Sequence, residues 1–209
     1  MHGGGRYQAH HPGGKSKREA ARLTPTAPTS YLEHMAILSI IIAPDPRLKV
    51  TAKPVARVDA RVRKLMDDML ETMYAAPGLG LAAPQVGQAL RVLVIDPARE
   101  GEPAQPMRVA NPKVVWASPE EVACEEGCLS LPEQFAEVTR PAEVKVRYLD
   151  HENEIREVHA KGLLAVCLQH EMDHLEGVLF VDHLSSLRRN MILRRLTKAK
   201  RQKAAPVPA

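Results

Sequence analysis

Apolar residues recur along residues 59–76 at the spacing of a helix, with polar residues between them. The run opens with Asp59, and its apolar positions are Val62, Leu65, Met66, Met69, Leu70 and Met73. Positions three and four apart share one face of a helix, so the pattern predicts an amphipathic helix capped by Asp59. We interpret the methionines as core residues, and we expect the helix to end near Ala76-Pro77-Gly78.

Other apolar runs have the length and alternation of strands. The expected strands are residues 37–42, 91–96, 109–116 and 143–149, the last pairing with 155–159 as a hairpin. Residues 163–175 read LLAVCLQHEMDHL. In the first half of this segment nearly every face of a helix would be apolar, which is typical of a buried helix.

Residues 180–184 form a short connector to a last helix, capped by Ser185 or Ser186. Its apolar side is expected to contain Leu187, Met191, Ile192 and Leu196. This order of elements predicts an α+β fold, with antiparallel sheets surrounding a central buried helix and with a C-terminal helix.

Charge is distributed unevenly along the 209 residues. The net charge is +4, but residues 1–34 carry +3 and residues 185–209 carry +8, so residues 35–184 carry −7. We therefore divide the chain into a disordered leader, tag or non-native extension (1–34), a folded domain (35–184) and a basic C-terminal helix and tail (185–209). The basic arm suggests contact with a polyanion, although a solvated tail would have the same composition.

The three cysteines are Cys124, Cys128 and Cys167. An odd number without a secretory signal argues against a disulfide framework and indicates a reducing cytoplasm. Organellar import is expected only if residues 1–34 are a genuine transit peptide. Cys167 is interpreted as a small buried hydrophobe. No apolar run approaches the length of a membrane span, so no membrane association is expected.

The second half of the buried helix carries the pattern H-E-x-x-H. His170 and His174 are four residues apart on one helical face, so both can reach one metal ion, with Glu171 beside it. A catalytic metal needs a third protein ligand. Cys128 is the best candidate because it stands in a Gly-flanked loop, and further candidates lie downstream: Glu176, Asp182 and His183. Spacing alone does not decide between Cys128 and a downstream acid.

Three segments together resemble peptide deformylase. They are Gly78 to Gln85 (GLGLAAPQ), Glu126 to Ser130 (EGCLS) and Gln169 to His174 (QHEMDH). The resemblance extends from about Met35 to the end of the last helix, and it is to the bacterial type, close to the enterobacterial enzymes. It implies that residues 35–184 are a catalytic domain that removes the formyl group from the N-terminal formylmethionine of nascent polypeptides. Phe135 departs from this pattern, because the enterobacterial enzymes carry a basic residue there.

The resemblance also implies roles for individual residues. The metal ligands would be Cys128, His170 and His174, holding Fe²⁺ as the favoured ion, with Zn²⁺ and Ni²⁺ also accepted. Glu171 would be the general acid/base, taking a proton from metal-bound water and delivering it to the leaving amine. Gln85 and the backbone N–H of Leu129 would bind the developing oxyanion, and Gly80 would lie along the bound peptide.

The methionine side chain of such a substrate needs an apolar pocket. Leu79, Leu163 and Val166 are the candidates, the last two about two turns and one turn before His170; plain core packing is the alternative. The peptide could add as a strand to an exposed edge near 78–81.

Second-layer groups are expected to hold the metal ligands in place. Glu126 and Asp173 are the candidates, with Asp173 pairing with Arg140. The resemblance implies that the basic C-terminal helix docks on the ribosome near the tunnel exit, and we expect a monomer. Two alternatives remain: an H-E-x-x-H metalloprotease with a downstream third ligand, and a ribosome-associated binding protein whose structural metal is closed by Cys124.

Overall fold

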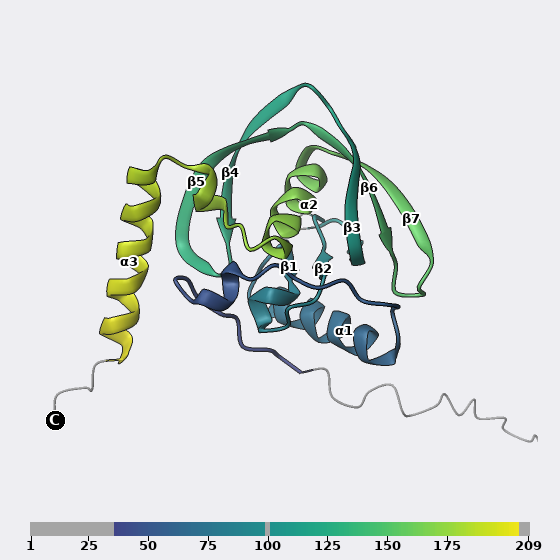
Figure 1. Cartoon of the computed structure of the whole chain (residues 1–209), viewed down its shortest axis with the longest axis horizontal. Helices are drawn as coiled ribbons and strands as arrows, with labels where there is room; N and C mark the ends of the chain where they lie inside the picture. The colour runs from purple at the N-terminus through teal and green to yellow at the C-terminus, as the bar shows by residue number, and fades with distance from the viewer. Residues whose placement is uncertain (1–35, 99–100, 205–209) are drawn as a thin grey trace, which may run out of the picture. The chain divides into compact units, whose positions relative to one another are not determined.

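A computed structural model describes residues 36–98 and 101–204 (Figure 1). The expected leader at 1–34 lies outside these residues. The elements, in chain order, are η1 (Pro46–Lys49), α1 (Ala60–Ala75), β1 (Gly80–Ala82), η2 (Ala83–Val86), β2 (Val92–Ile95), β3 (Met107–Ala117), β4 (Glu121–Cys128), β5 (Leu131–Pro141), β6 (Glu143–Leu149), β7 (Ile155–Lys161), α2 (Gly162–Leu175), η3 (Phe180–His183) and α3 (Ser186–Ala204).

The strands form two antiparallel sheets. One has five strands in the order β1-β2-β3-β6-β7, and the other is the β4–β5 hairpin. Figure 1 shows α2 at the centre, with β4 and β5 on one side and β6 and β7 on the other. The predicted α+β class, with antiparallel sheets around a central helix and a helix at the C-terminal end, is confirmed.

Helix α1 forms as its sequence pattern predicts. The Asp59 carboxylate accepts a hydrogen bond from the Val62 backbone N–H at 3.0 Å, which satisfies one of the free donors at the helix start. Met66, Met69 and Met73 are fully buried in one cluster with residues of β1 and β2. The methionine stripe is therefore core, and α1 supports the strands that lead to the site.

Helix α2 is the element that carries the motif into the interior. Its apolar residues Leu168 and Leu175 are fully buried, and they pack in one cluster with Val146 of β6 and Ala160 of β7. The predicted hairpin at 143–159 is confirmed as β6 and β7, with β7 extending to Lys161. The packing of α2 against this hairpin fixes the orientation of its polar end.

Two expectations about strands are wrong. Residues 37–42 form no strand, because their N–H groups are used elsewhere: Leu38 N–H donates to Thr72 Oγ1 at 2.9 Å and Ile41 N–H to the Gln85 carbonyl at 2.8 Å. The β4–β5 hairpin was not anticipated. Cys128 accordingly ends a strand, at the register shift next to the hairpin turn, rather than standing in a loop.

Helix α3 packs on the body through half of its expected apolar side. Ile192 and Leu196 are buried in one cluster with Leu48 and Phe180, whereas Leu187 and Met191 are 71% and 47% exposed. Of the four apolar residues expected on one side of this helix, only Ile192 and Leu196 are therefore covered by the body. In the described part of the chain, no helix combines the length and apolar character that crossing a membrane requires.

Candidate active site

Two elements bring the candidate metal ligands together. Cys128 comes from the end of β4, while His170 and His174 come from successive turns of α2. One ligand atom from each residue lies within 4.8 Å of the others, and Cys128 Sγ is 3.2 Å from His174 Nε2. The structure thus assembles the three ligands from segments more than forty residues apart.

The chemistry of these three groups fits a divalent transition metal. His170 Nδ1 is 2.8 Å from a Glu126 carboxylate oxygen, so we assign the ring proton to Nδ1, leaving the Nε2 lone pair for an ion. Burial lowers the pKa of His174 well below its ordinary value and keeps that imidazole neutral. Burial alone would lower the pKa of His170, but hydrogen bonds with Cys128 and Glu126 outweigh it and raise this pKa well above its ordinary value, so an ion bound there would displace a proton from the ring. One sulfur and two imidazoles match the donors of a catalytic site with an open position.

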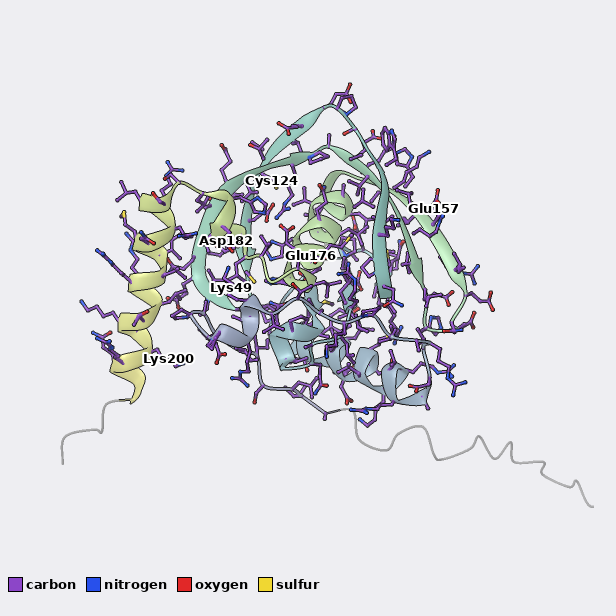
Figure 2. All side chains as sticks on the ribbon, viewed as in Figure 1. Lys49, Cys124, Glu157, Glu176, Asp182 and Lys200 are labelled. Atoms are coloured by element: carbon purple, nitrogen blue, oxygen red, sulfur yellow. The ribbon has the colours of Figure 1, made fainter. Side chains whose placement is uncertain are left out.

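The alternative ligands are engaged elsewhere. Glu176 pairs with Arg91 at 2.5 Å, and His183 Nε2 is 2.7 Å from Asp173 Oδ2. Asp182 pairs with Lys49, and Figure 2 shows these two side chains together between η1 and η3. Among the described residues, the group that could hold an ion includes none of these and does not include Cys124. This geometry disfavours both a downstream third ligand and a site closed by Cys124.

A buried ionic network stands behind the ligands. Arg140 donates from Nε and Nη2 to the two oxygens of Glu126, at 2.5 and 3.0 Å, and from Nη1 to Asp173 at 2.9 Å. Burial alone would raise the pKa of Glu126, but hydrogen bonds from His170 and Arg140 outweigh it and lower this pKa. Glu126 therefore remains a carboxylate that orients His170. The expected contact of Arg140 with Asp173 is present.

Glu171 lies beside the ligands and is nearly buried. Its Oε2 is buried and has no hydrogen-bond partner among the described residues. Burial raises the pKa of this carboxyl to about 7, which suits a group that both accepts and returns a proton near neutral pH. Gly80 of β1 lies directly against it: a Cβ there would overlap Oε1 and come 2.7 Å from Cδ.

Gln85 has its amide fixed on both sides. Its Oε1 accepts from the Ala82 N–H at 2.7 Å, so its NH₂ group faces Ser130 Oγ at 3.1 Å and Cys128 Sγ at 3.5 Å. Ser130 is a positioning residue that the sequence analysis did not single out, although it belongs to the quoted EGCLS segment. Leu129 also borders the site, with its side chain against Gly78.

A cavity of about 380 Å³ opens next to Glu171 and the ligands. All of the residues proposed for the methionine pocket line it: Leu79, Leu163 and Val166. Cys124, Cys167 and Phe135 line it as well and were not assigned to it from the sequence. Burial raises the pKa of the Cys167 thiol to about 12, so this sulfur stays protonated and contributes an apolar wall.

Comparison with known proteins settles the family. The polypeptide deformylase family model matches residues 37–190. A peptide deformylase of Phenylobacterium zucineum (strain HLK1) is 57% identical over 164 residues, covering 78% of this chain and 97% of that protein. The chain belongs to the peptide deformylase family.

Further relatives agree with this membership. A peptide deformylase of Rhizobium meliloti (strain 1021) is 54% identical, covering 82% of this chain and 98% of that protein. The crystal structure of peptide deformylase from Ehrlichia chaffeensis in complex with actinonin is 44% identical with a TM-score of 0.77, covering 79% of this chain and 99% of that one.

Family membership carries the general function. Peptide deformylases are metal-dependent hydrolases of protein biosynthesis, and the family name implies N-formylmethionyl peptides as substrates. The two sequence relatives are alphaproteobacterial, so special closeness to the enterobacterial enzymes stays a prediction.

Proposed function

We propose that this chain hydrolyses the formyl group from the N-terminal formylmethionine of nascent polypeptides and releases formate. The observation that carries the proposal is the cluster of Cys128, His170 and His174 beside a buried, unpaired Glu171 at the end of an apolar cavity. Water adds to the formyl carbon, the C–N bond breaks, and the products are formate and a free amino terminus.

Each residue of the site would have a separate role in this reaction. Cys128, His170 and His174 would hold the ion, which when bound supplies Lewis acidity that makes water a nucleophile near neutral pH. Glu171 accepts the proton that water loses and returns it to the departing nitrogen. The Gln85 NH₂ group and the Leu129 backbone N–H donate to the formyl oxygen as negative charge develops on it; losing one such donor typically lowers the rate by about 10²–10³.

The enzyme would recognise its substrate through the substrate's methionine side chain and through its peptide backbone. Leu79, Leu163 and Val166 would surround the methionine side chain in the cavity. Gly80 lies in β1, which pairs with β2 and ends the five-stranded sheet, so an extended peptide can add to it through backbone hydrogen bonds. Such bonds tolerate any following sequence, as an enzyme acting on most nascent chains requires.

For the ion we propose Fe²⁺, with Zn²⁺ or Ni²⁺ accepted in preparations. A thiolate with two imidazoles binds both iron and zinc, so the donor set supports this choice without excluding the others. The iron form should lose activity during hours in air while the nickel form keeps it, because Fe²⁺ beside a thiolate is oxidisable. Equal persistence of both forms would contradict iron as the resident ion.

We also propose a cytoplasmic monomer that docks on the ribosome near the tunnel exit through α3. Arg194 and Arg201 support this, because they lie on the side of α3 away from the buried Ile192 and Leu196 and are exposed. Deleting α3 would strip the core of those two residues, so charge reversal is the better test. Arg194→Glu with Arg201→Glu should weaken cosedimentation with bacterial ribosomes at low salt. Undiminished cosedimentation would count against this role.

The decisive experiment is formate release from formyl-Met-Ala-Ser by protein loaded with Fe²⁺ under anaerobic conditions, beside Glu171→Gln. The wild type should release formate, and the variant should be slower by roughly 10²–10⁴ while retaining its metal. Failure of metal-loaded wild type to release formate would overturn the proposed function.

A further inference from the structure

A second hollow lies on the far side of Phe135 from the active-site cavity. It has a volume of about 410 Å³ and lies between the β4–β5 hairpin and α3, with Phe135, Arg188, Met191 and Arg195 among its lining residues. Figure 1 shows α3 standing beside β5. We call this hollow the α3 groove; the catalytic proposal leaves it without a role.

Phe135 lies between the α3 groove and the active-site cavity. Glu133 and Phe135 line both hollows, so the two adjoin at these side chains. The Phe135 ring covers its cross-strand partner Gly127, where a Cβ would come within 2.6 Å of the ring, yet the residue is 65% exposed. A large apolar ring held in this exposed position offers a surface to a chain that leaves the cavity past Gly127.

The lining of the α3 groove is basic and apolar. Arg188, Met191 and Arg195 follow one another at helical spacing along one side of α3, which explains why Met191 is half exposed instead of buried. Neither Arg188 nor Arg195 takes part in an ion pair in the described part of the chain. The acidic residue in the lining of the α3 groove is Glu133. The stripe from Arg188 to Arg195 is about 10 Å long, enough for about three residues of an extended peptide.

We propose that a nascent substrate continues from the active site across Phe135 into the α3 groove, where Arg188 and Arg195 favour acidic side chains. The methionine would occupy the cavity, the second and third residues would cross the ring, and roughly the fourth to sixth would lie along α3. This inference rests on the proposed function. The α3 groove adjoins the active-site cavity at Glu133 and Phe135, which favours the substrate itself as occupant over a separate partner.

The test compares three substrates: formyl-Met-Ala-Ser, formyl-Met-Ala-Ser-Glu-Glu-Leu and formyl-Met-Ala-Ser-Lys-Lys-Leu. Wild-type protein should show a kcat/KM about threefold to tenfold higher for the acidic hexapeptide than for the basic one, because exposed ion pairs are individually weak. The difference should lie in KM and should shrink at high salt.

Two double variants with the same change of charge on the same helix separate the α3 groove from general electrostatics. Arg188→Glu with Arg195→Glu should abolish or reverse the acidic preference, whereas Arg194→Glu with Arg201→Glu, on the other side of α3, should retain it. Phe135→Ala should raise KM for both hexapeptides alike.

The outcomes are distinguishable. Equal kcat/KM for the two hexapeptides in wild type, or equal loss of preference in both double variants, would overturn the α3 groove as a substrate site. No formate from any of the three peptides would instead overturn the proposed function, and this inference with it.

Discussion

At the scale of single residues, the site depends on how closely backbone and side chains approach Glu171. The absence of a side chain at Gly80 lets β1 lie against a carboxylate that is otherwise enclosed by α2 and the hairpin. This close contact limits where the Glu171 carboxylate can lie. A glycine is needed here for close approach, and not for an unusual backbone angle.

Gly80→Ala should therefore lower kcat by roughly tenfold to a hundredfold, because the new methyl group displaces the Glu171 carboxylate by about 1 Å. The measurement is formate release, with bound metal and thermal unfolding recorded for the same sample. The ligands are not touched, so metal content should stay at the wild-type level. Wild-type kcat in a fully metallated variant would show that the carboxylate does not need this position.

Arg140 is the residue on which the ligand support depends. Its side chain and that of Glu126 are 6% and 4% exposed, so neither charge is compensated by solvent when its partner is removed. Arg140→Met should lower the free energy of unfolding by about 3–5 kcal/mol, as measured by urea denaturation. Adding Glu126→Gln should recover part of this loss, since the buried carboxylate that loses its guanidinium partner is then replaced by a neutral amide. A loss below about 1 kcal/mol would contradict the importance of the network.

Much of this residue-scale picture could be predicted from the sequence, and the reason is local geometry. The i, i+4 spacing of His170 and His174 on an apolar helix places them correctly without any knowledge of the fold. Spacing alone could not choose between Cys128 and a downstream acid, because the distance of Cys128 from α2 depends on the hairpin; the family resemblance decided for Cys128. Ser130 and the wall formed by Cys167 needed the assembled structure for the same reason.

At the scale of elements, α3 differs most from its sequence pattern. Its four expected apolar positions separate into two that are buried and two that face outward, one of them in the α3 groove. Helical periodicity identifies a face but cannot say how much of it a neighbour covers. The predicted strand at 37–42 is absent for a related reason. Its apolar residues indicated a strand, but the Leu38 N–H donates to Thr72 of α1 and the Ile41 N–H to the backbone of η2.

The uneven burial of α3 gives a matched pair of leucine substitutions. Leu196→Ala should lower the free energy of unfolding by about 2–5 kcal/mol, because a side chain 5% exposed leaves a cavity in the core. Leu187→Ala, in the same helix but 71% exposed, should change it by less than about 0.5 kcal/mol. Both are measured by urea denaturation. Equal effects would mean that α3 does not pack on the body as described.

The β4–β5 hairpin was not predicted from the sequence because both of its faces carry polar residues. Glu121 to Cys128 reads EVACEEGC. Its inward positions are Cys124 in the cavity wall, Glu126 in the ionic network and the candidate ligand Cys128. A strand whose buried face carries functional polar side chains, and not apolar ones, lacks the alternation of apolar and polar residues on which strand prediction relies. Functional sites are where such a conflict is expected.

At the scale of the whole molecule, the ligands connect two structures that share no strand pairing in the described residues. Cys128 belongs to the two-stranded hairpin, and the histidines belong to α2, which packs on the five-stranded sheet. A bound ion would therefore act as a cross-link between them. Its removal should affect stability as well as activity.

Metal removal should accordingly lower the melting temperature. An ion present at about a thousandfold excess over its Kd stabilises the folded state by about 4 kcal/mol, or roughly 10 °C for a domain of this size. Calorimetry with and without a chelator measures the difference. Glu171→Gln should show the same difference in melting temperature with and without the ion, whereas Cys128→Ser should show a smaller one. Identical melting with and without the ion would argue against a site that spans the two sheets.

The shortness of β1 has a consequence for how the protein behaves in concentrated solution. An exposed strand edge invites pairing with other chains and is a common route to aggregation. With three residues, β1 offers only about 10 Å of edge, and an untethered chain gains few hydrogen bonds there. A peptide already anchored by its first side chain gains the same few bonds without a second association step. The length of β1 is therefore compatible with the proposed addition of an anchored substrate strand, while it leaves little edge for self-assembly.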